Sequence, residues 1–316
     1  MGKVAFVFPG QGAQYPGMGK EFYQNFKIAK EVYEAASDTL HMDMASICFE
    51  GEEHELKKTE NTQPAILTTS IAMLEVLRQE GLQCDVTAGL SLGEYASLVS
   101  SEVLDFEEAV ALVQKRGKYM QEAVPEGVGT MAAILGLENE ALQRCIMEAS
   151  EKGVVEVANY NSPSQIVISG EIKAVQKCVE LATEKGAKKA IILPVSAPFH
   201  CQLLKPAGIK LERDLMNVRV GSPRIPVVSN ITGRMIEDER EIRPSLVKQV
   251  SQSVRWQESI ELMLNEEVDT FIEIGPGKSL SGFIKRIAKN EKKQIHSMNV
   301  EKLEDFNQLI NRVQVY

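Results

Sequence analysis

The chain has 316 residues, of which 44% are hydrophobic and 25% are charged, a composition typical of a globular protein with a sizeable core. Its net charge of -9 argues against nucleic-acid binding, because phosphate recognition requires a basic surface. The first apolar run, at 4–8, is too short for a signal-peptide core, and no later run is long enough for a membrane span. We therefore expect a cytoplasmic protein that binds neither nucleic acid nor membrane.

Short apolar strands alternate with helices in the first part of the chain. We expect strands at 4–8 and 86–90, and helices at 21–40, 63–79 and 105–123. Asp105, with Glu108 three residues later, predicts a capping box at the start of the last helix. Alternating strands and helices predict a parallel sheet with helices on its faces.

A self-contained pattern follows, bounded by a Gly-rich segment at 125–129 and a Pro-containing segment at 194–199. Its order of strands and helices is βαββαβ, which is that of a ferredoxin-like unit. We expect this unit, residues 127–197, to be a subdomain inserted in a large α/β domain formed by 1–126 and 198–316. In the returning part of that domain we expect strands at 225–230, 269–275 and 295–300, and helices at 245–265 and from 279.

Ser91 lies at the centre of the sequence Gly89-Leu90-Ser91-Leu92-Gly93, between a predicted strand and a predicted helix. In this context G-x-S-x-G is typical of the nucleophile elbow of α/β-hydrolase-like folds. The two glycines are needed because the turn is too tight for side chains at their positions. The helix that follows presents backbone N–H groups to a developing oxyanion. We therefore predict a nucleophilic Ser91. The alternative is a small-residue turn with an idle serine.

A nucleophilic serine requires a base, and His200 is the candidate, because it follows the last strand of the inserted unit on an irregular segment. The other histidines have polar surroundings and are expected at the surface: His41, His54 and His296. No acidic residue has the context of a hydrolase triad, so a backbone carbonyl is the expected partner of the imidazole. Cys201 adjoins His200, but neighbouring side chains diverge, which argues against a Cys–His pair.

Metal ligation and redox chemistry have little support in the sequence. The five cysteines form no CxxC pair, and no two of the four histidines have the spacing of a metal-binding pair on a helix. We expect the cysteines to be packing residues and the protein to hold neither a metal nor another cofactor.

Arg116 lies on the apolar stripe of the helix predicted at 105–123, whereas Lys115 and Lys118 point elsewhere. An arginine that faces inward needs an anion. That anion is either a structural Asp or Glu, or the carboxylate of a substrate held in a bidentate clamp. The sequence alone leaves both alternatives open.

Two glycine-rich segments resemble phosphate-binding loops without completing either pattern. Tyr15 occupies the position of the third glycine after Gly10 and Gly12, which argues against a dinucleotide fingerprint. Ile272 stands where a P-loop ending at Lys278 needs its first glycine. The first segment can instead present the backbone N–H of Gln11 as an oxyanion donor.

Six blocks now stand in order along the chain: FPGQGAQ (8–14), GLSLGEYASLV (89–99), QKRG (114–117), APFH (197–200), SVRWQESI (253–260) and EIGPGKSLSG (273–282). Together they resemble the malonyl-CoA:acyl carrier protein transacylases and the acyltransferase domains of polyketide and fatty-acid synthases. The resemblance runs from residue 4 to about 290, nearly the whole chain.

The resemblance implies an acyl-carrier-protein S-malonyltransferase. Such an enzyme moves the malonyl group from malonyl-CoA to a serine and then to the phosphopantetheine thiol of an acyl carrier protein, by a ping-pong mechanism. It implies no cofactor besides these substrates, and we expect a monomer. The implied pathway is fatty-acid synthesis, with a trans-acting acyltransferase of polyketide synthesis as the alternative.

The resemblance also implies a set of site residues: Ser91 as nucleophile, His200 as base, the backbone N–H groups of Gln11 and Leu92 as oxyanion hole, the backbone carbonyl of Gln249 as partner of His200, Arg116 as carboxylate binder, Phe199 as the malonyl-selecting residue, and Met120 and Asn161 as pocket residues. One position departs from the family, which usually has histidine immediately before the serine, where this chain has Leu90. Because the residue beside the serine points away from Oγ, we expect the chemistry to survive.

Two rival functions remain. A serine hydrolase would use the same elbow with water in place of the carrier thiol, and a silent binding module would dock carrier proteins without reacting. Arg116, the absent triad acid and the inserted unit favour transfer over hydrolysis, and the intact Ser91 and His200 argue against the silent module.

Overall fold

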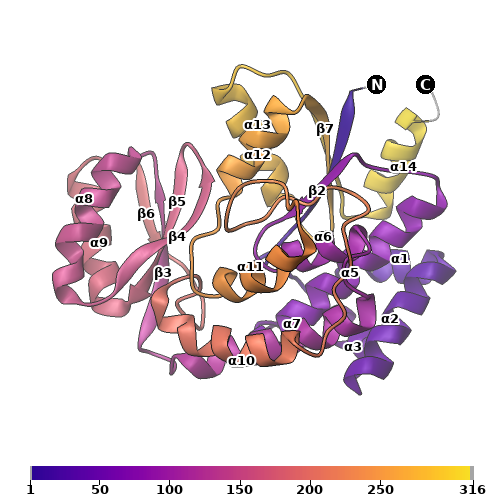
Figure 1. Cartoon of the computed structure of the whole chain (residues 1–316), viewed down its shortest axis with the longest axis horizontal. Coiled ribbons are helices and arrows are strands. Elements are labelled where there is room, and N and C mark those ends of the chain that lie inside the picture. The colour runs from indigo at the N-terminus through magenta and orange to yellow at the C-terminus, as the bar shows by residue number, and fades with distance from the viewer. Residues whose placement is uncertain (1, 314–316) are drawn as a thin grey trace.

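The computed structural model describes residues 2–313 and contains two β-sheets (Figure 1). The first sheet is parallel and has the strand order β2-β1-β7-β8. Its strands are β1 (Lys3–Phe8), β2 (Val86–Gly89), β7 (Val268–Ile274) and β8 (His296–Val300). The parallel sheet that we predicted from the alternation of strands and helices is confirmed.

Strand β1 is covered by helices on both faces. Phe6 and Phe8 pack in the core cluster that contains α5 (Thr59–Gln79). Ala5 and Val7 pack on the opposite side, in the cluster that contains α12 (Trp256–Asn265) and α13 (Ser279–Asn290). Successive strand side chains point to opposite faces, so an unbroken apolar run requires cover on both sides.

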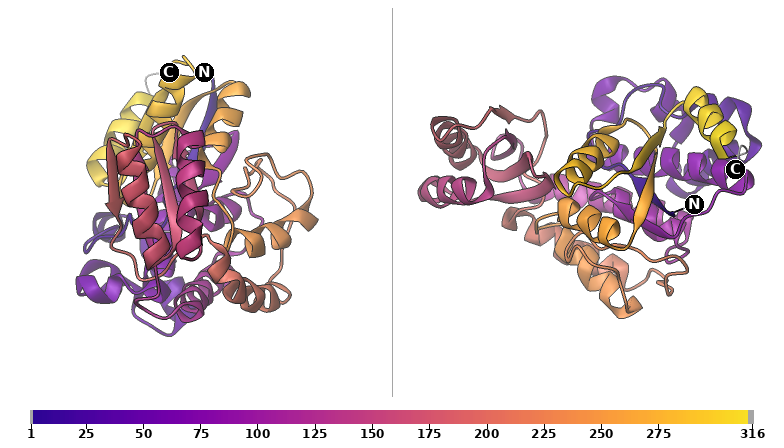
Figure 2. Two further views of the ribbon diagram at one scale, coloured as in Figure 1. Left: turned by 90° about the vertical axis from the view of Figure 1, so that its left-hand side faces the viewer. Right: turned by 90° about the horizontal axis from the view of Figure 1, so that it is seen from above.

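The second sheet is antiparallel, with strand order β4-β5-β3-β6, and its strands are β3 (Gly129–Leu135), β4 (Val155–Ser162), β5 (Gln165–Glu171) and β6 (Lys189–Ile192). Helices α8 (Asn139–Ala149) and α9 (Ile172–Glu184) cover one face, and this unit stands to one side of the molecule (Figures 1 and 2). The order β3-α8-β4-β5-α9-β6 and the pairing are those of a ferredoxin-like unit. The expected domain limits, 1–126 with 198–316 and 127–197, stay predictions.

The two faces of the second sheet have different neighbours. Ala132 and Ile134 pack against α8 and α9 in a cluster of their own. Met131, Ala133 and Val167 belong instead to the large core cluster of the first sheet. The second sheet therefore presents an apolar face to the rest of the molecule.

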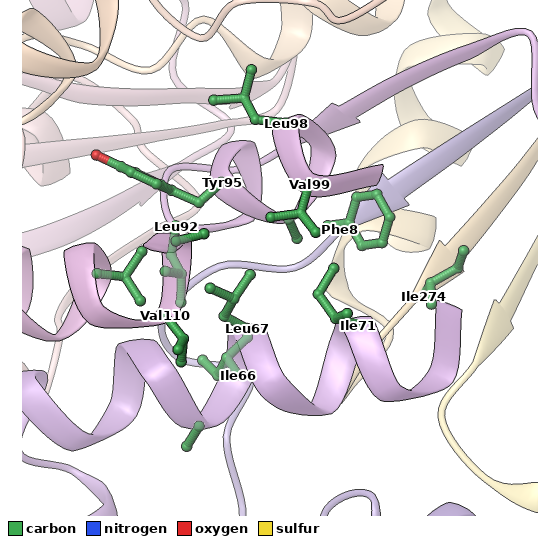
Figure 3. Packing of buried hydrophobic residues seen from close by; sticks show 14 of the residues in the cluster. Phe8, Ile66, Leu67, Ile71, Leu92, Tyr95, Leu98, Val99, Val110 and Ile274 are labelled. Carbon is green, nitrogen blue, oxygen red and sulfur yellow. The ribbon is translucent and has the colours of Figure 1, made fainter. Parts of the chain in front are cut away.

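Further helices complete the structure: α1 (Lys20–Asn25), α2 (Lys27–Leu40), α3 (Met44–Phe49), α4 (Glu53–Leu56), α6 (Gly93–Ser100), α7 (Phe106–Ala123), α10 (Lys205–Leu215), α11 (Ile242–Gln249) and α14 (Leu303–Val313). Single 3-10 turns lie at Ser150–Lys152, Gln202–Leu204 and Glu239–Glu241. Figure 3 shows how α5, α6 and α7 pack together, through side chains such as Leu67, Val99 and Val110. No helix within residues 2–313 has the length and apolarity needed to cross a bilayer.

Two predicted helices are each broken in two. The helix expected at 21–40 is interrupted at Phe26, which has extended backbone angles (φ -127°, ψ 122°) and packs its ring against Phe22 and Phe306. The helix expected at 245–265 is α11 and α12, separated by residues 250–255. Tertiary contacts override the apolar periodicity at these breaks. Helices α3, α4, α10 and α14 were not predicted.

The strand predicted at 225–230 is wrong. Val227 and Val228 form only isolated bridges, to Thr87 and Met235. Pro226 lacks a backbone N–H, and the chain turns directly after Val228, where the N–H of Gly233 bonds to the carbonyl of Ser229. Too few residues remain between the proline and the turn for a strand to form.

The predicted capping box is half present. Asp105 accepts hydrogen bonds from the N–H groups of Glu107 and Glu108, as an N-cap residue does. The carboxylate of Glu108 bonds to the N–H of Arg219 instead of returning to Asp105. The glutamate therefore ties α7 to the segment after α10.

A methyl group at Gly93 is expected to destabilise the fold. A Cβ there would lie 2.1 Å from the carbonyl oxygen of Phe8, so β1 and α6 would have to separate. We expect Gly93→Ala to lower the free energy of unfolding by about 1–3 kcal/mol, measured by urea denaturation. Gly282→Ala, in α13 with no atom within 4 Å of the added carbon, is the control and should be neutral or slightly stabilising. Equal stability losses in the two variants would contradict the close approach.

Candidate active site

Ser91 lies in a tight turn between β2 and α6. Its φ of 55° is in the left-handed region, which a residue other than glycine adopts only where the surroundings impose it. A Cβ at Gly89 would lie 1.9 Å from the backbone carbonyl carbon of Gly93, so the first glycine of the motif is a steric necessity. The predicted elbow geometry is present.

Asn230 fixes the turn around Ser91 through two side-chain hydrogen bonds, a role that the sequence did not predict. Its Oδ1 accepts from the N–H of Ser91 at 2.6 Å, and its Nδ2 donates to the carbonyl of Gly89 at 2.7 Å. The side chain is fully buried and thus bridges both sides of the turn. Its signal in the sequence is an asparagine two residues after the apolar segment 225–228, which predicts a turn as readily as a clamp.

His200 contacts Ser91, although the two residues are 109 positions apart. The distance from Ser91 Oγ to His200 Nε2 is 2.7 Å, and the distance from His200 Nδ1 to the backbone oxygen of Gln249 is also 2.7 Å. Since a carbonyl only accepts, Nδ1 carries the proton and Nε2 is left to accept from the serine hydroxyl. The expected backbone partner is in place.

The break between α11 and α12 explains why this carbonyl is available. Gln249 is the last residue of α11, and the final carbonyls of a helix have no partner within it. An unbroken helix at 245–265 would have used the carbonyl internally. Because the sequence predicts one unbroken helix, it does not show that the carbonyl of Gln249 is free to bond to His200.

The environment keeps the imidazole neutral. Burial, together with the positive charge of Arg116, lowers the pKa of His200 from 6.5 to about 4. His200 is only 4% exposed. A neutral imidazole whose Nε2 faces a hydroxyl is the form that a general base requires.

Arg116 is buried and reaches the same serine. Its Nη2 donates to Ser91 Oγ at 3.2 Å and to Gln249 Oε1 at 2.8 Å, and its Nη1 donates to Gln63 Oε1 at 2.8 Å. Its guanidinium lies 5.4 Å from the centre of the Tyr95 ring. No carboxylate oxygen lies within 4.0 Å of it in the described part of the chain, which argues against the structural ion pair that the sequence left open.

Glu94 is a buried acid that the sequence did not single out. Burial raises its pKa to about 7, and its hydrogen bonds with Gln249 and Asn230 oppose that rise. Its carboxylate accepts from Gln249 Nε2 and from the N–H of Asn230, the latter at 3.2 Å. Glu94 thus links the clamp under the serine to the residue that holds His200. An acid in the first turn of the apolar helix at 93–100 was the available signal.

A cavity of about 530 Å³ is lined by Ser91, Arg116 and His200. Residues of both sheet units line it, including Leu90, which follows β2, and Met131 of β3. Among the predicted site residues, the walls contain Gln11, Ser91, Arg116, Met120, Asn161, Phe199 and His200. Leu90, the position that departs from the family, also borders it.

The predicted oxyanion donors are free. The backbone N–H groups of Gln11 and Leu92 have no hydrogen-bond partner within residues 2–313. Leu92 lies directly before α6, so its N–H belongs to the unpaired donors of a helix start. These two groups are thus available to a negative oxygen.

The three other histidines and Cys201, which we did not expect in the site, take no part in these contacts. His41, His54 and His296 are exposed. The Cys201 thiol bonds to the carbonyl oxygen of Pro198 at 3.2 Å, and burial raises its pKa to about 11, so it is a packing residue. No group of three or more metal-ligating side chains occurs among the described residues.

Comparison with known proteins confirms the resemblance found in the sequence. A malonyl CoA-acyl carrier protein transacylase of Bacillus subtilis is 48% identical over 288 residues, which cover 91% of each chain, and one of Escherichia coli is 44% identical over 91% of this chain and 93% of its own. The crystal structure of such a transacylase from Clostridium perfringens matches with a TM-score of 0.95 at 47% identity, covering 99% of this chain and 97% of its own.

A further structure holds a type II polyketide acyl-carrier protein in complex with its malonyl-transacylase, and matches with a TM-score of 0.94 at 40% identity over 98% of this chain and 99% of its own. The model of the acyl transferase domain matches residues 5–304. The chain therefore belongs to the acyl transferase domain family.

Proposed function

We propose that this protein transfers the malonyl group of malonyl-CoA to the phosphopantetheine thiol of an acyl carrier protein. The observation that carries the proposal is one cavity in which Ser91 contacts both a neutral His200 and the cationic Arg116. A serine with its base provides acyl transfer, and an unpaired cation beside it provides recognition of an acyl group that ends in a carboxylate. The names of the relatives agree with this activity.

The first half-reaction loads the serine. His200 Nε2 accepts the proton of Ser91 Oγ, and Oγ attacks the thioester carbonyl of malonyl-CoA. The backbone N–H groups of Gln11 and Leu92 stabilise the oxyanion of the tetrahedral intermediate. The carbon–sulfur bond then breaks, and the imidazolium returns its proton to the departing CoA thiolate.

The second half-reaction transfers the malonyl group from Ser91 to the carrier thiol. The imidazole accepts the proton of the carrier thiol, whose sulfur attacks the carbonyl of the malonyl-serine. The same oxyanion donors act again, the ester bond to Oγ breaks, and the proton passes back to Ser91. The order is ping-pong, because one site serves both thiols in turn.

Arg116 binds the distal carboxylate of the malonyl group in this proposal. Met120, Asn161 and Phe199 limit the space around it, with Phe199 excluding branched acyl groups. Asn161 Oδ1 is buried without a hydrogen-bond partner among the described residues, so it is available to the substrate. The position before the serine carries Leu90, and the Ser91–His200 contact is formed without a histidine there.

The pathway and the setting are also part of the proposal. We assign the enzyme to fatty-acid synthesis in the cytoplasm, with a trans-acting role in polyketide synthesis as the alternative. The structural neighbour in complex with a polyketide acyl-carrier protein keeps that alternative open. We further propose that 127–197 is an inserted subdomain, supported by its separate sheet and core cluster.

Removing the cation should abolish the preference for malonyl over acetyl. A charge-assisted hydrogen bond contributes roughly 1.5–3 kcal/mol, so we expect Arg116→Ala to lower kcat/KM for malonyl-CoA by about 10–100-fold per contact relative to acetyl-CoA. The measurement is transfer of each acyl group to a carrier thiol. An unchanged ratio would contradict the carboxylate clamp. Consumption of malonyl-CoA by the wild-type chain at the same rate without carrier would indicate a hydrolase instead.

The pH dependence should reflect the depressed pKa of the histidine. The base acts only when neutral, and burial lowers the pKa of His200 to about 4, so the neutral form persists well below the usual 6.5. We expect kcat/KM for malonyl-CoA to decrease as the pH is lowered, with a midpoint near pH 4. Glu94→Gln is the control, because it removes a second buried group that titrates, near pH 7. An acid midpoint near 6.5 in both proteins would contradict the assignment.

A further inference from the structure

Within residues 2–313, the guanidinium of Arg116 donates hydrogen bonds to neutral groups alone. The acceptors are the amide oxygens of Gln63 and Gln249, each at 2.8 Å, and the hydroxyl of Ser91 at 3.2 Å. Arg116 is only 1% exposed, so little of its charge is solvated by water in place of an anion. Buried cations are normally paired, because an isolated charge is costly in a medium of low dielectric constant.

The nearest acid does not supply the missing charge directly. Glu94 is separated from Arg116 by the side chain of Gln249, whose Oε1 accepts from the arginine while its Nε2 donates to the glutamate. Burial raises the pKa of Glu94 to about 7, so at neutral pH this carboxyl is ionised in only part of the molecules. The cavity wall at Arg116 is therefore electropositive while the site is empty.

Gln63 has few other tasks in the site. It is buried on α5, and among the described residues its Nε2 donates a hydrogen bond only to Met120 Sδ, at 3.6 Å. Gln249 has several, because its backbone oxygen bonds to His200 and its Nε2 also donates to the carbonyl of Ser91 at 2.9 Å. A change at Gln63 therefore alters the surroundings of Arg116 with the least disturbance of the serine and histidine.

We propose that Gln63 is a specificity-determining residue, because its amide orients the guanidinium of Arg116 without cancelling its charge. The substrate carboxylate then supplies the counter-charge that the protein withholds. A glutamate in place of Gln63 would keep the shape and the acceptor oxygen but would pair with the arginine internally. This inference rests on the proposed malonyl transfer and adds the reason why the arginine discriminates.

The test compares Gln63→Glu with Gln63→Met in transfer to a carrier thiol. For Gln63→Glu we expect kcat/KM for malonyl-CoA to fall by about 10–100-fold, mainly through KM, while acetyl-CoA is much less affected. For Gln63→Met, which removes the acceptor and adds no charge, we expect a smaller loss of the malonyl preference, because Arg116 is oriented less well but keeps its charge. Gln79→Glu, the same substitution at an exposed position of α5, is the matched control and should leave both rates unchanged.

The ratio of the two substrates separates a charge effect from a structural one. A purely structural role of Gln63 would lower malonyl and acetyl transfer equally in Gln63→Glu, and that result would overturn the proposal. If thermal melting shows that Gln63→Glu does not fold, Gln63→Met decides: a reduced malonyl preference supports the proposal and an unchanged one overturns it. Failure of the wild-type chain to transfer malonyl at all would instead overturn the proposed function.

Discussion

The hydrogen bond between Ser91 Oγ and His200 Nε2 is the contact on which the rest of the site depends. It joins the elbow after β2 to a segment that follows the second sheet, so it exists only if both sheet units are correctly placed. Both partners have left-handed backbone angles, φ 55° for the serine and 59° for the histidine. The strain is offset by surrounding contacts, among which the Asn230 clamp and the Gln249 carbonyl act directly on these two residues.

A second constraint is the distribution of buried charge. Burial lowers the pKa of His200 and Arg116 adds to this effect, while Arg116 stands beside Ser91 without an ion-pair partner in the described chain. In the proposed function the same cation thus acts on the base and on the substrate. Gln249 connects these two residues, since its backbone oxygen bonds to His200 and its side chain bonds to Arg116. His200 and Arg116 are therefore both positioned by a single residue at the end of α11.

The sequence predicts the parts of this site that follow local rules. Gly89 has its steric reason within the five-residue motif, because a side chain there would meet Gly93, although Gly93 itself is required by the distant Phe8. The apolar stripe around Arg116 indicates its burial by spacing alone. The free backbone donors at Gln11 and Leu92 lie where a loop and a helix start predict them. The partner carbonyl at Gln249, in contrast, came from family resemblance rather than from the residues.

Features that depend on distant parts of the chain were missed. Periodicity predicts one helix at 245–265, but the segment 250–255 turns out of the helix and meets β4, where the N–H of Tyr160 bonds to the carbonyl of Val254. Asn230 was placed in a strand, because nothing local distinguishes a clamp from a strand end. The roles of Gln63 and Glu94 follow from their hydrogen bonds with Arg116 and Gln249, which lie far from them along the chain.

In the proposed mechanism the acyl group is bound covalently to Ser91 between two separate transfers. Rapid mixing of the protein with malonyl-CoA in the absence of any carrier, with CoA release followed over the first turnover, tests it most directly. The proposed mechanism predicts a burst of CoA that approaches one equivalent per chain and is absent in Ser91→Ala. Release of CoA only after the carrier thiol is added would contradict it.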